Sequence, residues 1–255
     1  MEKCLGYLKR FFGTVDIALR CSWQLIFSCI AMFLILTGQF QLIDIVWVLL
    51  AHYVLYTLGL EIGYHKLLTH RSFTTHTVIK NILATIGILT CHPPALQWVA
   101  LHRLHHGYSD KPKDPHSPWQ PKRGLLAYLF LVKWPYVDFN PEFKNDSYLR
   151  WISHNQGTIL WLATIPLLFV DLKTFLVWFA IPSIISPYCL GIANYYTHQG
   201  KHNGYDHARN FYWVELIAPG MGFHGNHHDS GSTWSLAKKY WWIDLSSIVV
   251  KLIKR

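Results

Sequence analysis

The chain has 255 residues, of which 51% are hydrophobic and 15% are charged, whereas an average soluble domain carries about 25% charged residues. Its formal net charge is +9, and its 16 histidines outnumber its 14 acidic residues. These values exclude a disordered, collagen-like or coiled-coil chain and favour a membrane protein that binds metal. The 23 basic residues are spread thinly, which favours an anionic membrane surface over nucleic acid as a partner.

Four apolar segments are predicted as membrane spans. They comprise residues 22–38, 42–60, 156–170 and 174–195. The alternative is a set of buried helices in a soluble α-protein, but such helices usually keep a polar face. The last segment contains Pro182 and Pro187, and membrane helices tolerate interior prolines better than soluble helices do.

A fifth apolar run, residues 78–101, contains Lys80, His92 and two consecutive prolines. A single crossing by this run would place the histidines before and after it on opposite sides of the membrane, and two crossings do not fit its length. We therefore predict an interfacial or re-entrant segment.

The basic residues predict the orientation of the spans. The N-terminal segment carries four Lys or Arg, residues 61–155 carry eleven and residues 196–255 carry seven, whereas residues 39–41 and 171–173 carry none and one. The positive-inside rule then places both termini and the middle segment in the cytoplasm. We predict an all-α, multi-pass integral membrane protein with a single domain, residues 1–255. Four transmembrane helices support a cytoplasmic helical cap (61–155 and 196–255) that holds a histidine-ligated dimetal site.

Nine histidines and one asparagine form four clusters on the predicted cytoplasmic side, near the ends of the spans. The clusters are His65 and His70; His102, His105 and His106; Asn194 and His198; and His224, His227 and His228. Imidazole is a ligand for iron, copper, zinc and nickel, and nine histidines are more than one ion can take. We therefore predict two metal ions, with Asn194 holding a water ligand at one of them.

The spacing within the clusters predicts which side chains meet. Residues at positions i, i+3 and i+4 share one face of a helix, so His102, His105 and His106 are expected to point to one place, as are the histidines of the second HxxHH motif at 224–228. His65 and His70 are about 140° apart on a regular helix. They either serve different metals or lie on a helix that unwinds between them.

Carboxylates are scarce near the clusters, and the chain lacks the Glu-x-x-His pair of soluble diiron proteins. Five acids are candidates either to orient imidazoles or to be solvated surface groups: Glu61, Asp110, Asp114, Asp206 and Asp229. The other seven histidines are assigned ordinary core or surface roles: His52, His76, His92, His116, His154, His202 and His207.

The clusters and their flanks resemble the membrane-bound fatty acid desaturases, specifically the Δ9, stearoyl-CoA desaturase-like branch. The resemblance covers most of the chain and rests on GYHKLLTHRSF (63–73), WVALHRLHHGYSD (98–110), DPH (114–116), NYYTH (194–198) and DHARNFYWVELIAPGMGFHGNHH (206–228). This chain departs from the family pattern at three positions. The family often has Arg where this chain has Lys66, and in the last histidine box this chain has Met221 in place of an acid and Gly225 in place of an asparagine. These departures remove no expected ligand.

The resemblance implies a set of site residues. It implies that two iron ions are ligated by His65, His70, His102, His105, His106, His198, His224, His227 and His228, with a water-mediated contact from Asn194. It also implies a kinked acyl tunnel under the cap. Trp98 matches a family tryptophan near the acyl chain, and Lys122 and Arg123 match a basic pair that contacts the acyl-carrier head group in animal relatives. Core packing and attraction to the membrane surface are equally consistent roles for these three residues.

The expected function is an O2-dependent desaturase that introduces a cis double bond, at the Δ9 position, into an acyl-CoA or acyl-lipid. The chain has no fused cytochrome b5-like domain, so electrons are expected from a separate donor of the cytochrome b5 or ferredoxin type. One alternative is a diiron lipid or alkane hydroxylase. Another is a histidine-rich membrane metal-binding or transport protein, although transporters place their ligands near the bilayer midplane.

Overall fold

The computed structural model describes residues 2–119, 122, 124–131, 135, 137, 143, 145–199, 207–237 and 244–255, with side chains described from Thr14 onward. The regular elements of these residues are helices, and one isolated bridge joins Trp119 and Lys122. The chain is therefore the helical protein that its sequence predicts, within the residues described.

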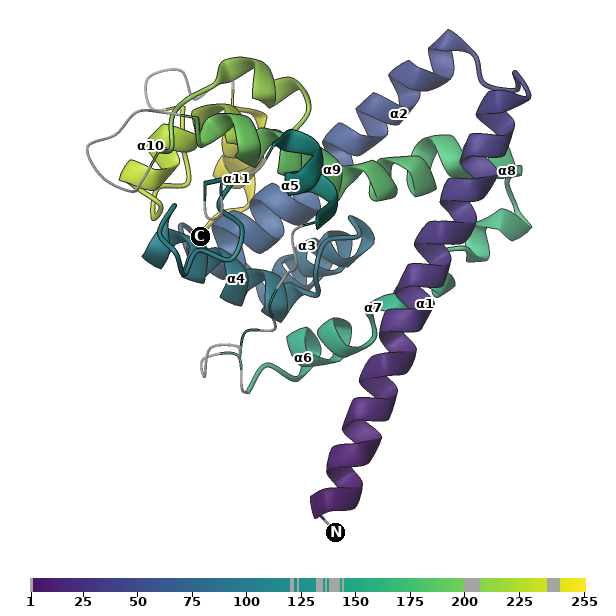
Figure 1. Ribbon diagram of the computed structural model, residues 1–255, viewed down its shortest axis with the longest axis horizontal. Helices are drawn as coiled ribbons and strands as arrows, with labels where there is room; N and C mark the ends of the chain where they lie inside the picture. Colours follow the sequence, from purple (N-terminus) through teal and green to yellow (C-terminus); the bar gives the residue numbers. More distant parts are fainter. Residues whose placement is uncertain are drawn as a thin grey trace.

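Three helices are long and apolar enough to cross a membrane. The first is α1 (Glu2–Leu36), and the second joins α2 (Leu42–Leu55) to the π-helix η1 (Tyr56–Thr69). The third joins α8 (Leu172–Phe175), η4 (Leu176–Ala180) and α9 (Ile181–Thr197). Figure 1 shows α1 as the longest element, with its N-terminal end projecting away from the other helices. These helices correspond to the predicted spans 22–38, 42–60 and 174–195.

The remaining predicted span, residues 156–170, forms two short helices, α7 (Gln156–Leu162) and η3 (Ile165–Leu168). Pro166 lies at the start of η3, where a proline can begin a helix but cannot continue one. Neither helix alone reaches the length of about 20 residues that a membrane-spanning helix needs. Helix α7 packs closely against α1, because the Gly157 N–H donates to Asp16 Oδ1 at 2.8 Å and an added Cβ at Gly157 would lie 2.3 Å from the Asp16 carbonyl oxygen.

The ambiguous run 78–101 forms two helices that meet at a turn. Helix α3 (Thr77–Leu89) ends at Thr90, and α4 (Ala95–Tyr108) begins after Pro94. The chain reverses between them, where Cys91 has a φ of 57°. This agrees with the prediction that the run does not form a single continuous span.

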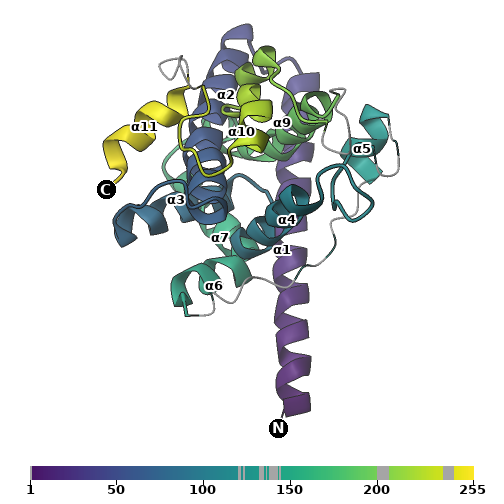
Figure 2. The same ribbon diagram turned by 90° about the vertical axis from the view of Figure 1, so that its left-hand side faces the viewer.

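The residues that the sequence predicts as a cap form short helices, apart from the stretch that continues the second long helix to Thr69 and from α3 and α4. They include α5 (Leu125–Leu131), α6 (Ser147–His154), η5 (Tyr212–Leu216), η6 (Met221–Phe223), α10 (His224–Asp229) and α11 (Leu245–Ile253). Figures 1 and 2 show α4, α10 and α11 gathered on one side of the molecule, away from the N-terminal end of α1. A core that includes the buried Tyr64, Leu96, Trp98 and Leu149 joins η1, α4 and α6. This core fixes the elements that carry the histidines.

Candidate metal centre

The π-helix brings His65 and His70 to one place. The His70 N–H donates to the His65 carbonyl at 3.0 Å, which is the i→i+5 bond that defines a π-helix. The two rings lie 4.8 Å apart between centroids. The helix is therefore locally altered between the two residues, and both histidines belong to one potential metal-binding group. His65 also lies within the long helix that continues the span 42–60, whereas the sequence assigned it to the cap.

The nine clustered histidines form two groups, each of which could hold a metal ion. One group comprises His65, His70, His102, His106 and His227, and the other comprises His105, His198, His224 and His228. Within each group the ligand atoms all lie within 4.8 Å of one another. Nitrogens bound to one ion at about 2.0–2.1 Å lie up to about 4 Å apart, so a small contraction lets each group enclose an ion.

The two HxxHH motifs are divided between these groups. In α4, His102 and His106 belong to the first group and His105 to the second. In α10 the division is reversed: His227 belongs to the first group, and His224 and His228 belong to the second. The expectation that each motif points to one place is therefore wrong: each helix lies between two sites and contributes to both.

The imidazole nitrogens within the groups face one another at hydrogen-bonding distance. His65 Nε2 lies 2.9 Å from His227 Nε2, and His198 Nε2 lies 2.9 Å from His224 Nε2. The buried Nε2 atoms of His70 and His105 have no hydrogen-bond partner among the described residues. Buried polar atoms are normally satisfied, and clustered lone pairs of this kind are satisfied by a cation. These residues therefore fit a pair of metal ions.

Three buried carboxylates orient three of the imidazoles. Glu61 accepts from His65 Nδ1, Asp110 from His198 Nδ1 and Asp114 from His105 Nδ1, each at 2.8 Å. An Nδ1–H that donates to a carboxylate leaves Nε2 as the nitrogen available to a metal. Of the other two candidate acids, Asp229 is exposed and Asp206 lies outside the described residues.

Burial keeps the histidines of the cap in their neutral form. Loss of hydration, followed by the proximity of other imidazoles, holds the pKa of His102, His105, His224 and His227 well below its usual value. Metal binding requires a neutral imidazole. The site is therefore prepared for a cation at neutral pH.

His116 is a buried neighbour of the site that sequence reasoning assigned to an ordinary role. Its ring lies 4.2 Å from that of His105, and it forms a further potential metal-binding group with His105 and Asp114. Burial lowers its pKa to about 3. The DPH stretch was noted as part of the resemblance, but a lone histidine in a loop carries no spacing that would reveal this position.

The other histidines with assigned ordinary roles are mostly remote from the two groups. His52 is buried, with Nε2 lying 2.7 Å from the Ile217 carbonyl oxygen, which matches a satisfied core residue. His76 and His154 are exposed, and His207 is half-buried. His202 lies outside the described residues, and His92 lines the cavity described next.

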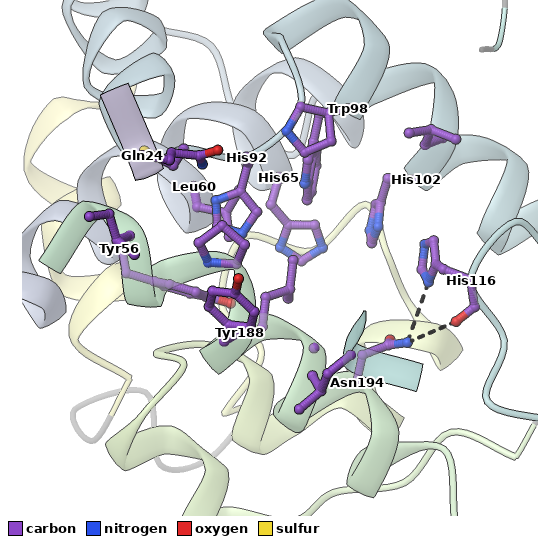
Figure 3. Close-up of a pocket in the computed structure, with 18 of the residues that line it drawn as sticks. Gln24, Tyr56, Leu60, His65, His92, Trp98, His102, His116, Tyr188 and Asn194 are labelled. Carbon is purple, nitrogen blue, oxygen red and sulfur yellow. Dashed lines mark hydrogen bonds between the residues drawn. The ribbon is translucent and has the colours of Figure 1, made fainter. Parts of the chain in front are cut away.

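A cavity of about 540 Å3 extends from the histidine groups toward α1. His65, His102 and His224 line it together with the buried Trp98, which stacks on His102 with centroids 4.7 Å apart. Figure 3 shows His102, His116 and Asn194 at one side of the cavity and Gln24, Tyr56 and Tyr188 at the other. Cavities of this size accommodate small organic ligands.

The remaining predicted site residues differ in their placement. Asn194 is buried and lines the cavity, and its amide Nδ2 donates to the Tyr128 hydroxyl at 2.6 Å; its contact with a metal-bound water stays a prediction. Lys122 is exposed, and its Nζ lies 5.5 Å from the centroid of the Trp119 ring. It does not line the cavity, and Arg123 lies outside the described residues.

Glu215 is a half-buried glutamate near the site, and its sequence context gives no signal of a role. Glu215 in η5 accepts the N–H groups of Gly220 and Gly222 at 2.8 and 3.0 Å. Burial, together with the nearby carboxylates of Asp244 and Glu61, raises its pKa to about 7. Glu215 thus holds the backbone turn that precedes α10 and its histidines.

The fold and the site define a helical membrane protein with two buried histidine groups beside an internal cavity. The family model for fatty acid desaturases matches residues 42–243, which is most of the chain. The chain is 28% identical to the sn-1 stearoyl-lipid 9-desaturase of Anabaena variabilis, over 88% of this chain and 85% of that protein. It is 27% identical to Delta-9 acyl-lipid desaturase 2 of Arabidopsis thaliana, over 82% and 71%. It is also 28% identical to the hex-5-enoyl-[acyl-carrier protein] acetylenase of Moorena producens, over 79% and 71%.

The chain belongs to the fatty acid desaturase family, and it is an oxidoreductase. This membership confirms the resemblance that the histidine clusters carried in the sequence.

Proposed function

We propose that this chain is an O2-dependent acyl-lipid desaturase that introduces a cis double bond at the Δ9 position of a saturated chain. The single observation that carries the proposal is the cavity that begins at two histidine groups and continues between apolar and aromatic side chains such as Leu60, Trp98 and Leu190. The reaction removes two hydrogens from adjacent methylenes, consumes one O2 and two electrons with two protons, and releases two waters.

Two iron ions are the proposed cofactor, one held by each histidine group. When bound, they supply the oxidising power that acid–base residues lack against an unactivated C–H bond. The chain's own residues fix the geometry. Glu61, Asp110 and Asp114 hold three imidazoles in one orientation, and Trp98 forms part of the cavity wall beside the first group. Asn194 is proposed to hold a water at one ion.

The acyl carrier is proposed to be a membrane lipid because two of the relatives named above are a stearoyl-lipid and an acyl-lipid desaturase. The acetylenase acts on an acyl-carrier protein substrate by its name, so carriers differ among the relatives. Lys122 and Arg123 are a proposed contact for the head group of a soluble carrier such as CoA or acyl-carrier protein, and Trp98 is a proposed contact for the acyl chain. Electrons are proposed to come from a separate cytochrome b5- or ferredoxin-type donor.

We also propose four membrane crossings, with both termini and the histidine groups in the cytoplasm. Two contacts support the fourth crossing. At one end of the segment, Gly157 bonds to Asp16 in α1. At the other end, Lys173 Nζ pairs with Asp44 Oδ2 at 2.7 Å, beside the loop that joins α1 to α2. Residues 157–173 therefore begin beside Asp16 of α1 and end beside Asp44 in the first turn of α2, although no single helix covers this length.

Expression in a desaturase-deficient host, followed by gas chromatography of the fatty acids, tests the proposal. A new cis-Δ9 monoene is expected, and the His105→Ala variant should not form it because that imidazole belongs to the second group. A hydroxylated chain in place of the monoene would instead identify the hydroxylase alternative. No change in the fatty acids, from a chain that is expressed and binds iron, would refute both activities.

A further inference from the structure

The cavity has a polar end, away from the two histidine groups. Arg20 and Gln24 of α1 line it, together with Tyr188 of α9 and His92 of the turn between α3 and α4. Figure 3 shows Gln24, His92 and Tyr188 on the side opposite to His116. A saturated acyl chain makes no use of hydrogen-bonding groups, and burying such groups unpaired is costly. This end is therefore built for a different part of a ligand.

His92 supplies a buried acceptor to this polar end. The Thr90 hydroxyl donates to the Gly87 carbonyl at 2.7 Å and lies 3.0 Å from His92 Nδ1. With the single hydroxyl proton directed to Gly87, His92 Nδ1 carries a proton and donates to Thr90 Oγ1. His92 Nε2 is then a bare acceptor. The side chain is 2% exposed, and Nε2 has no hydrogen-bond partner among the described residues.

The polar end also contains donors. Arg20 donates to Gln156 Oε1 at 3.2 Å, which uses one of the five N–H groups of its guanidinium. Gln24 adds an amide with both a donor and an acceptor. Burial lowers the pKa of His92 to about 3, so that its ring is neutral. A ligand that matches these groups has an oxygen that accepts and a hydroxyl that donates.

This end opens on a surface that faces the bilayer. Leu25 is 66% exposed and Tyr188 is 42% exposed, and both line the cavity. Cys21, also in the lining, is exposed. All three lie within helices that are long and apolar enough to cross a membrane, Thr14–Leu36 and Leu172–Thr197. The opening between α1 and α9 therefore gives access from lipid and not from water.

We propose that Arg20, Gln24 and His92 form a subsite for the ester end of a membrane glycerolipid that enters between α1 and α9. The ester carbonyl accepts from Arg20 or Gln24, and a head-group hydroxyl donates to His92 Nε2. The acyl chain then extends along the cavity toward the histidines. This last point rests on the proposed desaturase function, whereas the polar subsite can be tested by binding alone.

The test measures binding to the purified, iron-loaded full chain in detergent, without oxygen, so that no turnover is needed. The probe is a stearoyl phosphatidylglycerol with a nitroxide near the methyl end of its acyl chain, and the immobilised fraction is read from its electron spin resonance spectrum. Gln24→Leu and His92→Phe should each weaken binding about five- to tenfold, because each removes one hydrogen-bonding group. Their controls are Gln39→Leu and His154→Phe, which change the same residue types outside the cavity lining.

Stearoyl-CoA with the same label tests whether the subsite recognises a membrane lipid or a soluble acyl carrier. Unchanged lipid binding by both variants would refute the subsite, and an equal loss for both probes would refute its assignment to a membrane lipid. Failure of the desaturase proposal would instead leave a Gln24- and His92-dependent binding signal with no monoene product.

A second measurement does not depend on variants of the polar groups. Cys21 and Cys29 are both exposed on α1, but only Cys21 lines the cavity. In chains that retain one of these as the only cysteine, a bulky maleimide on Cys21 should block lipid binding and the same label on Cys29 should not. Equal binding by the two labelled chains would refute entry at this opening.

Discussion

Lys66 is a buried side chain that connects the histidine groups, through Glu61, to the C-terminal helix. Its side chain is 2% exposed, and Nζ lies 3.3 Å from Glu61 Oε1 and 3.6 Å from Asp244 Oδ2. Nζ also donates to the Ser246 hydroxyl at 2.5 Å. Asp244 caps α11 by accepting the Ser247 N–H, and Glu61 orients His65 through its other oxygen. Lys66→Met would leave two buried carboxylates without their cation.

Removing one partner of a buried ion pair costs about 3–5 kcal/mol. For a domain of this size, a change of 1 kcal/mol moves the melting temperature by about 2–4 °C, so Lys66→Met should lower it by about 6–20 °C. Lys66→Arg keeps the charge and should recover most of this loss. Thermal denaturation in detergent, followed by fluorescence-detected size exclusion, measures the shift. A Lys66→Met protein that melts within about 2 °C of wild type, or an Arg variant as unstable as the Met variant, would refute this reasoning.

Three further predictions concern the surroundings of the histidines. Asp114→Asn should weaken metal binding about 10–100-fold in a chelator competition, because the carboxylate that orients an imidazole is lost; unchanged affinity would contradict this role. Gly220→Ala should lower both stability and metal content more than Gly38→Ala. Both glycines have a positive φ, but only at Gly220 would an added Cβ lie 2.3 Å from the Glu61 carboxyl carbon. Equal effects of the two substitutions would show that this clash is relieved. Burial raises the Glu215 pKa from its ordinary 4.5 to about 7, so the folded protein binds more protons than the unfolded one between these values. The Glu215 carboxyl should therefore contribute at most about 3 kcal/mol of stability at pH 4.5 that is lost by pH 7. The buried neutral histidines give the opposite slope, so the test is the difference between two proteins: in denaturant titrations the wild type should lose stability relative to Glu215→Gln as pH rises, and a difference that does not change with pH would contradict the assignment.

The sequence predicted which histidines come together better than it predicted their arrangement. Apolar length and histidine spacing are local signals, and they identified three long helices and the nine histidines that form the two groups. The division of each HxxHH motif between two groups depends on where α4 and α10 lie relative to each other, which spacing on one helix does not contain. The meeting of His65 and His70 depends on a π-helix, and a π-helix has no recognisable residue pattern.

The site residues that the sequence did not indicate are placed by contacts with residues far away along the chain. His116 and His92 are lone histidines, and only folding places one beside His105 and the other in the cavity. The acids were open to two roles in the sequence. Contacts between residues that are 88 positions apart, such as Asp110 with His198, decided in favour of orienting an imidazole.

The central claim is that this chain holds two iron ions in two separate histidine groups. Quantitative metal analysis of the purified full chain, with exhaustive dialysis, tests it most directly. Two irons per chain should resist dialysis, and iron should be lost in both His70→Ala and His198→Ala, because each variant removes one ligand from one group. A single retained metal, or zinc that exchanges freely and is unaffected by either variant, would contradict the claim.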